Sequence, residues 1–457
     1  MGLGTAAQRC ASGHGGRALA WVLTCALAAC APELTDDLPD LDLTAAYASV
    51  PLALRQEEGP SEMGFSDPIL DRLMAAALQG NPGLATARAR LRAAAAEARA
   101  AGATVTGNGD ASLSFNSRGS DVFSLGLGAR LDPSRAARRV AASARAEAAQ
   151  YDARDARRLL LEELATTYVN LRYYQQLLEF RRADVASRRR TLSEIEILRG
   201  AGAATEMDVI SARALLVEAR GRLPGIEAEA VRQRNLLSTL VGRPVGDLDV
   251  NLAFTRTQPL PKGVADHGVP ADLLRARPDI RRAERLYAAA LADIAAARAS
   301  LYPSLSLSGL VRVPLDGGAG TASLVPGLTI PVFARPSLKA GVEAADARAI
   351  AAFEQWRSTV LAAVEELESA LAVRAAAGRA AIASAEVVAL QRRALDLSRR
   401  LLVAGGEITA LDILDREQAL SAARATLAQD RREVALAHIL LLAALGLDRV
   451  GVEKPRS

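Results

Sequence analysis

Hydrophobic residues along most of the chain recur at the spacing of three and four that is typical of helices, and in two stretches they alternate with polar residues instead. The longest helical stretch, residues 134–199, contains neither proline nor glycine and would extend about 100 Å at 1.5 Å per residue. Within it, apolar residues one heptad apart are Leu164, Leu171, Leu178, Val185 and Leu192. This spacing predicts a coiled-coil seam, although an ordinary helical core would show the same stripe.

A second long helical stretch lies in the other half of the chain. Its apolar positions, at alternating spacings of three and four, are Val387, Leu390, Ala394, Leu397 and Leu401. Each long stretch ends at a pair of glycines, Gly200 and Gly202 in one half and Gly405 and Gly406 in the other, and another helical stretch follows. We therefore predict two antiparallel hairpins, in each of which a second long helix returns along the first.

Residues 110–131 and 304–333 alternate with a period of two, which predicts two pairs of strands. One predicted face is apolar: Ala111, Leu113, Phe115, Phe123, Leu125, Leu127, Ala129 and Leu131, then Leu305, Leu307, Val311, Val313, Leu324, Leu328, Ile330 and Val332. The other face is small and polar, which suits a water-filled lumen, although a soluble sheet with one buried face would also alternate. Four strands are too few to close in lipid, so a membrane sheet would require several copies of the chain.

Residues that typically end or begin helices, mainly proline and glycine, recur at corresponding positions and indicate an internal repeat. The pairs that recur roughly 200 residues apart are Asn81-Pro82 with Arg277-Pro278, Pro133-Ser134 with Pro336-Ser337, Gly202 with Gly406, Asp208 with Asp412, and Gly242 with Gly446. We therefore divide the chain into residues 1–29, 30–64, 65–242, 243–268, 269–446 and 447–457. The two long segments, 65–242 and 269–446, share one plan: a helix, two strands and a long hairpin, 134–241 or 336–445.

The amino-terminal stretch predicts export and lipid attachment. Two arginines precede an apolar run, residues 18–29, that is too short to span a bilayer but fits the core of a signal peptide. Leu27-Ala28-Ala29-Cys30 resembles a bacterial lipoprotein box, which implies cleavage before Cys30 and its acylation; an ordinary signal peptide is the alternative. Because Ala31 follows the cysteine, we expect sorting to the outer membrane, with no cofactor beyond this covalent lipid.

Composition excludes several classes of function. The 457 residues carry 56 basic and 52 acidic side chains, interleaved along the chain, which argues against a nucleic-acid binder. Abundant alanine with only 4% aromatic residues favours close packing of helices over bulky globular cores. All three cysteines fall within the first thirty residues, and the three histidines form no metal-ligand motif. Because no phosphate loop or nucleophile motif is present either, we predict that the protein is not an enzyme.

Several motifs resemble those of the outer-membrane efflux proteins, the TolC-like outer-membrane factors, and especially the lipoprotein branch that serves tripartite, RND-type pumps. The resemblance is carried by Phe65-Ser66-Asp67-Pro68, Asn81-Pro82, Leu273-Leu274-Arg275-Ala276-Arg277-Pro278-Asp279-Ile280, Ala283-Glu284, Tyr302-Pro303 and Pro331-Val332-Phe333. It covers the chain from about residue 65 to residue 446. It departs from the family pattern at residues 129–135, where the usual aromatic and Gly-Arg pattern is not intact.

This resemblance implies a mainly α-helical fold with a membrane β-barrel. It implies a homotrimer in which each chain gives four strands to one 12-stranded barrel, and in which the hairpins form a periplasmic α-barrel. Substrates would pass by passive conduction from an inner-membrane transporter and a periplasmic adaptor to the outside. A non-channel lipoprotein that acts as a coiled-coil scaffold or adaptor is the alternative.

The resemblance also implies roles for the hairpin tips. Adaptor contacts would involve Gly200, Gly202, Thr205, Asp208, Gly405, Gly406 and Thr409, and the glycines would also suit helix C-caps. A gate would involve Leu411, Asp412 and Asp415, with the leucines forming an apolar plug and Asp415 an anionic ring that favours cations. Alternatively, Asp412 stabilises the start of its helix and Asp415 pairs with an arginine.

Overall fold

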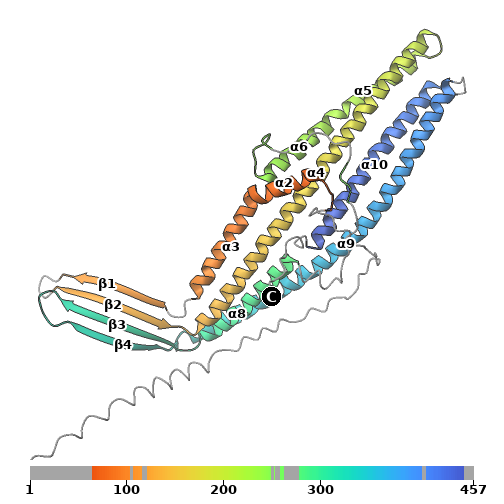
Figure 1. Cartoon of the computed structure of the whole chain (residues 1–457). Helices are drawn as coiled ribbons and strands as arrows, with labels where there is room; N and C mark the ends of the chain where they lie inside the picture. The colour runs from red at the N-terminus through yellow and green to blue at the C-terminus, as the bar shows by residue number, and fades with distance from the viewer. Residues whose placement is uncertain are drawn as a thin grey trace, which may run out of the picture. The chain divides into compact units, whose positions relative to one another are not determined.

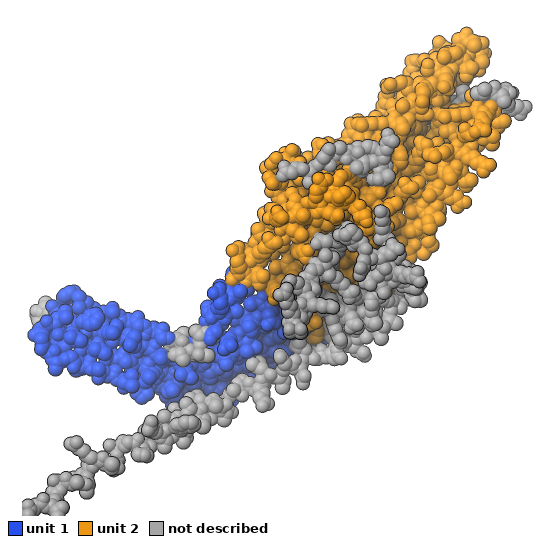
Figure 2. Space-filling model, in the orientation of Figure 1, with its two compact units in different colours: residues 1–41, 93–147, 284–355 blue, residues 42–92, 148–283, 356–457 orange. Residues whose placement is uncertain are grey.

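The computed structural model describes residues 64–102, 106–115, 121–248, 252, 258–261, 277–403 and 408–446. It divides into two compact units, which Figure 2 colours separately. The described parts of residues 93–147 and 284–355 form the unit that contains the strands, and those of 42–92, 148–283 and 356–457 form the unit that contains the hairpin tips. The predicted signal peptide, Cys30, Gly405 and Gly406 lie outside the described residues.

Four antiparallel strands form one sheet in the order β1-β2-β3-β4 (Figure 1). They are β1 (Thr106–Ser114), β2 (Val122–Leu131), β3 (Ser304–Pro314) and β4 (Thr321–Thr329). The first begins four residues earlier than predicted, because glycines at 107 and 109 hide the alternation on the apolar face. The last ends at Thr329 and does not reach residue 333, since Pro331 lacks the N–H that would continue the ladder.

The register confirms the two predicted faces of the sheet. Leu307 pairs with Ala129 on one side and with Pro326 on the other, and Ser308 pairs with Gly128 and Val325 on the opposite face. The apolar face is exposed in the single chain, with exposed fractions of 63% for Leu127 and 69% for Leu324. The soluble sheet with one buried face is therefore not what the structure contains.

The hairpin of the first half consists of α4 (Ser134–Gly200), α5 (Glu206–Gly221) and α6 (Leu223–Val241). The prediction of a single returning helix is wrong here, because the return breaks after Gly221. Pro224 follows the break and cannot sit inside a helix without losing a hydrogen bond and clashing with the preceding turn. In the second half, α9 (Arg335–Val403) is followed by the unbroken α10 (Ala410–Ala444).

The predicted seam on α4 belongs to the hydrophobic core. Leu164, Leu171 and Val185 are buried, and the first two belong to a cluster with residues of α2 (Pro68–Gly80), α6 and α10. The ring of Phe65, in the same cluster, packs edge-on against the ring of His438, with 5.4 Å between the ring centroids. The helix after α2 is α3 (Pro82–Ala101).

The comparable stripe on α9 is not core in the single chain, contrary to the expectation from its spacing. Leu390 and Leu397 are 59% and 57% exposed. The reason is that α10 packs on a different face of α9. This face carries Leu395, which forms an apolar cluster with Ile413 and Leu420 of α10. The stripe therefore remains available to another surface.

Each repeat is joined at its base by an equivalent tie. In the first repeat, the side chain of Asn81 donates from Nδ2 to the carbonyl oxygen of Leu240 at 2.8 Å. In the second, Arg277, just before α8 (Pro278–Ala299), donates from a guanidinium nitrogen to the carbonyl oxygen of Ala444 at 2.9 Å. Gly242 lies two residues after Leu240 and has a φ of 79°. A Cβ at this position would lie 2.1 Å from the carbonyl oxygen of Gly80, so only glycine fits.

Candidate functional site

The two hairpin tips carry the same helix cap. At the start of α5, the Thr205 backbone N–H and hydroxyl donate to Asp208 Oδ2 at 2.8 and 2.7 Å, and the Asp208 N–H donates to the Thr205 hydroxyl. Thr409 and Asp412 form the same capping box at the start of α10, with matching distances of 2.8 and 2.7 Å. These hydrogen bonds lower the pKa of both carboxyl groups. The alternative role of Asp412, stabilising its helix start, is therefore observed.

The first hairpin turns at Gly202. This glycine has φ 78°, its N–H donates to the carbonyl oxygen of Arg199 at 3.0 Å, and the N–H of Ala203 donates to that of Leu198 at 2.8 Å. The pattern is a Schellman motif, in which a left-handed residue favours glycine. Gly200 is the last residue of α4 and has an ordinary negative φ, so its backbone makes no such demand.

The predicted gate residues occupy the first turns of α10. Asp412 and Asp415 are both exposed, one helical turn apart, and Asp415 makes no ion pair with any described residue. The alternative in which an arginine neutralises Asp415 is therefore not found within the described ranges. Leu411 belongs to the same helix, and its side chain lies outside what the structure describes.

A buried glutamate that the sequence analysis missed joins the two hairpins near their tips. The side chain of Glu417, on α10, is only 3% exposed. It accepts hydrogen bonds from the hydroxyls of Ser187 (2.7 Å) and Thr191 (3.2 Å) on α4, and from Arg399 of α9 at 2.7 Å. The only sequence signal was a polar residue on the face of α10 that also carries Ile413 and Leu420, which indicates burial but names no partner.

Apolar contacts reinforce this junction. Leu414, on the turn before Glu417, is buried in a cluster with Ile195 of α4 and with Val209 and Ala212 of α5. The start of α10 is therefore held against both helices of the first hairpin, while its exposed carboxylates, Asp412 and Asp415, face away from this contact. The acidic positions near the tip thus stand on a firmly packed helix.

Replacement of Glu417 by alanine is expected to loosen the junction. The buried Thr191 hydroxyl and the partly buried Ser187 hydroxyl lose their acceptor, which costs about 1–3 kcal/mol. Hydrogen exchange should rise in the segments around Ser187 and Glu417 and stay unchanged near the base of the hairpins. Glu218→Ala is the matched control, because Glu218 pairs with Arg222 on the exposed surface. Equal exchange in both variants would show that the junction does not depend on Glu417.

Two features that the described residues lack bear on the kind of site. No group of three or more histidine, cysteine, aspartate or glutamate side chains suitable for a metal ion occurs among the described residues. Within the same residues, every helix is too short or too polar to traverse a bilayer.

Comparison with known proteins decides the family. The family model described as outer membrane efflux protein matches residues 73–243 and 269–447, one segment in each repeat. The chain belongs to the outer membrane efflux protein family. Members of this family are channels, so the prediction that the protein is not an enzyme is confirmed.

Two relatives illustrate the similarity of this chain in sequence. Nodulation protein T of Rhizobium leguminosarum bv. trifolii is 32% identical over 293 residues, which are 63% of this chain and 62% of that protein. The solvent efflux pump outer membrane protein SrpC of Pseudomonas putida is 30% identical over 295 residues, with the same two shares. The chain thus matches just over three fifths of the length of each relative.

Solved structures share the fold of this chain. The outer-membrane channel OprN has a TM-score of 0.80 at 28% identity, and the match covers 90% of this chain and 98% of that one. CusC has a TM-score of 0.72 at 25% identity, with 89% and 99% covered. The predicted fold class, long helical hairpins with four strands per chain, is confirmed. The adaptor and gate roles of the tip residues stay predictions.

Proposed function

We propose that this protein is the exit duct of a tripartite efflux system, a homotrimeric outer-membrane channel through which substrates pass by passive conduction. The observation that carries the proposal is the sheet: its apolar face is exposed, its other face is small and polar, and its edge strands β1 and β4 each have only one partner in the described sheet. Unpaired strand edges cannot face lipid, so the sheet requires neighbours. The number three follows from the family.

The exposed stripe on α9 supports the same assembly. Ile382, Leu390 and Leu397 lie on one long helix with exposed fractions of 73%, 59% and 57%. Exposed apolar surface of this length is typical of an interface. Contact with the helices of a neighbouring copy would bury it and close the helical tunnel. Membership of the family supports the outer membrane as the location.

Heat-modifiable trimers and single-channel conductance in planar bilayers test the proposal. The purified chain is expected to migrate as a trimer before heating and to produce discrete conductance steps. A soluble monomer that needs no detergent would refute the channel and favour the non-channel scaffold or adaptor instead.

We propose further that Cys30 anchors the mature chain through lipid. A Cys30→Ser variant is expected to lose incorporation of radiolabelled palmitate entirely, because the thiol that carries the diacylglycerol is gone. Cys25→Ser, which changes a cysteine of the predicted signal peptide, is the matched control and should retain the label. Equal labelling of both variants would exclude Cys30 as the attachment site.

The hairpin tips are the proposed docking surface for a periplasmic adaptor, which in turn meets an inner-membrane transporter. Close to the first tip, Ile197, Met207 and Ile210 are 70%, 69% and 54% exposed. These side chains stand beside the Thr205–Asp208 cap, so a rigid helix start presents an apolar patch. An adaptor that buried this patch would gain hydrophobic free energy without reordering the tip.

Asp415 is the proposed anionic ring at the entrance. Asp415→Ala is expected to lower the preference of the channel for cations without changing trimer formation, because the exposed carboxylate makes no ion pair with a described residue. Reversal potentials in a salt gradient measure the change. Asp430→Ala, another acidic residue of α10, serves as the control. Identical selectivity in wild type and Asp415→Ala would count against the ring.

A further inference from the structure

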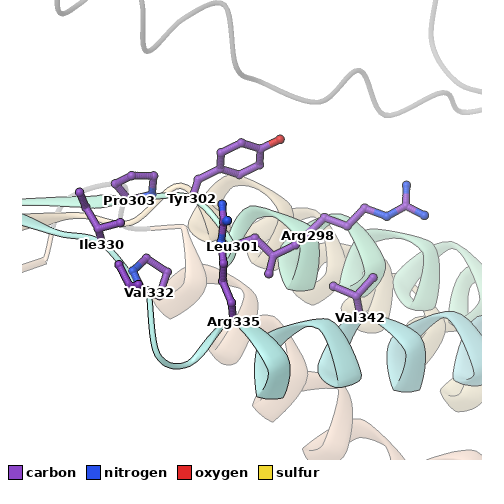
Figure 3. Close-up of a pocket in the computed structure, with 9 residues that line it drawn as sticks. Arg298, Leu301, Tyr302, Pro303, Ile330, Val332, Arg335 and Val342 are labelled. Carbon is purple, nitrogen blue, oxygen red and sulfur yellow. The ribbon is translucent and has the colours of Figure 1, made fainter.

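A cavity lies at the helix end of the β3–β4 hairpin and has a volume of about 660 Å³. Arg298, Leu301 and Tyr302 line it from the end of α8 and the turn that follows, and Ile330, Val332 and Arg335 line it from the connection between β4 and α9 (Figure 3). Arg335 rises from the start of α9 toward Leu301, and Arg298 extends on the other side of that leucine. The volume falls within the usual range of ligand pockets.

The cavity is positively charged. Neither Arg298 nor Arg335 forms an ion pair with another described residue, and the lining includes no acidic side chain. Arg335 is also the first residue of α9, so the partial positive charge of the helix N-terminus adds to the two guanidinium groups. An anion is therefore the ligand that this site favours.

Comparison with the first repeat indicates that Arg335 does not stabilise the start of α9. Its repeat mate is Asp132, which likewise precedes a Pro-Ser pair. Asp132 accepts hydrogen bonds from the backbone N–H of Ser134 at 2.9 Å and from the Ser134 hydroxyl at 2.7 Å, and thereby caps α4. A cation in that position opposes the helix dipole. The exchange of aspartate for arginine is favourable once an anion binds.

The apolar wall of the cavity lies just beyond the end of β4. Ile330 and Val332 follow Thr329, the last residue of the strand, and are 57% and 61% exposed. Tyr302 and Phe333 beside them are 58% and 99% exposed in a chain with only 4% aromatic residues. Aromatic side chains gather where the lipid headgroups lie. The cavity thus combines an anion site with a lipid-facing wall.

We propose that this cavity binds an anionic phospholipid of the periplasmic leaflet, with Arg335 contacting the phosphate and Ile330 and Val332 contacting the acyl chains. The exposed Arg298 side chain, which extends away from Ile330 and Val332 in Figure 3, would reach the same phosphate by a change of rotamer. The inference rests on the proposed function, which places the apolar face of the sheet in the outer membrane. Free inorganic phosphate shares the headgroup chemistry, but it would leave the apolar wall exposed. The lipid therefore accounts for both halves of the cavity.

Native mass spectrometry of the full chain in detergent, titrated with phosphatidylglycerol or phosphatidylcholine, tests the proposal. Wild type is expected to bind phosphatidylglycerol about tenfold more tightly than phosphatidylcholine, and Arg298→Gln/Arg335→Gln is expected to lose that preference. Arg312→Gln removes an exposed arginine from the polar face of β3 and should leave the preference intact. Equal phosphatidylglycerol affinity in the double variant and in this control would overturn the proposal, as would displacement of the lipid by an equal concentration of inorganic phosphate.

A second variant separates binding from folding. Arg335→Asp copies the residue that caps α4, so it should raise the melting temperature of the lipid-free protein while abolishing the lipid preference. Unchanged preference in this variant would also overturn the proposal. Conductance of the same samples distinguishes the two hypotheses: channels without lipid preference reject only this inference, whereas lipid preference without channels rejects the proposed function.

Discussion

Replacement of Leu307 by arginine is expected to abolish membrane assembly of the channel, whereas Ser308→Arg leaves it intact. Leu307 lies on the apolar face of β3 between Ala129 and Pro326. Arginine on a lipid-facing strand costs about 2–4 kcal/mol near the middle of the bilayer, and each copy in the oligomer incurs this cost. Ser308 faces the opposite side, next to Gly128, where water would surround the new charge.

The measurement is the yield of heat-modifiable oligomer in outer-membrane fractions. Because the two substitutions are adjacent and introduce the same side chain, synthesis and export affect them alike. If both variants assembled equally well, the apolar face would not lie in lipid. If both failed, the polar face would be packed against protein, as in a non-channel scaffold.

Replacement of Arg277 by alanine is expected to destabilise the second repeat by about 2–4 kcal/mol. The guanidinium is 3% exposed and contacts Asp279 and Glu366, each at 2.8 Å, as well as the carbonyl oxygen of Ala444. Its loss would remove this donor from Glu366 and the Ala444 carbonyl oxygen, and would leave Asp279 with the backbone N–H of Ile280. We expect a smaller destabilisation than for a fully buried ion pair, because the side chains of Asp279 and Glu366 are 24% and 32% exposed.

Thermal melting followed by circular dichroism measures this effect. Arg232→Ala is the control, since its ion pair with Glu229 is exposed and is screened by water and salt. A melting temperature for Arg277→Ala equal to that of the control would contradict the structural role of the tie.

The same tie predicts a pH dependence. Burial raises the pKa of Asp279, but the hydrogen bonds and charge of Arg277 outweigh it and lower the pKa below its usual value. The stabilisation is therefore complete above the unfolded pKa of about 4 and is lost as the pH falls through the lower folded value. Arg277→Ala should remove this part of the acid sensitivity.

Periodicity predicted the elements and their faces but not their partners. The alternation of β3 identified Leu307 and Ser308 as residues of opposite faces, because a strand has only two sides. The stripe on α9 was placed correctly along the helix, yet its spacing contained no information on whether α10 or another chain covers it. Contacts such as Ser187 with Glu417 join residues 230 positions apart, and neither residue belongs to a local motif.

The helix caps show where local chemistry suffices. When a threonine stands three residues before an aspartate, each side chain can hydrogen-bond to the backbone N–H of the other residue within one helical turn. The pairs Thr205 with Asp208 and Thr409 with Asp412 can therefore be recognised in the sequence as helix starts. The docking and gating roles proposed for these residues depend on other chains, which the sequence of one chain does not describe. The break after Gly221 was also local, because Pro224 marks it in the sequence, but one returning helix was predicted across it.

The equivalent hydrogen bonds at the base of the two repeats differ in the charge of their donor. In the first repeat the donor is a neutral amide, Asn81, and in the second it is a charged guanidinium, Arg277. Each reaches the carbonyl oxygen of the equivalent residue at the end of its own repeat. The internal repeat thus keeps the direction of this hydrogen bond while the charge of its donor differs between the two halves.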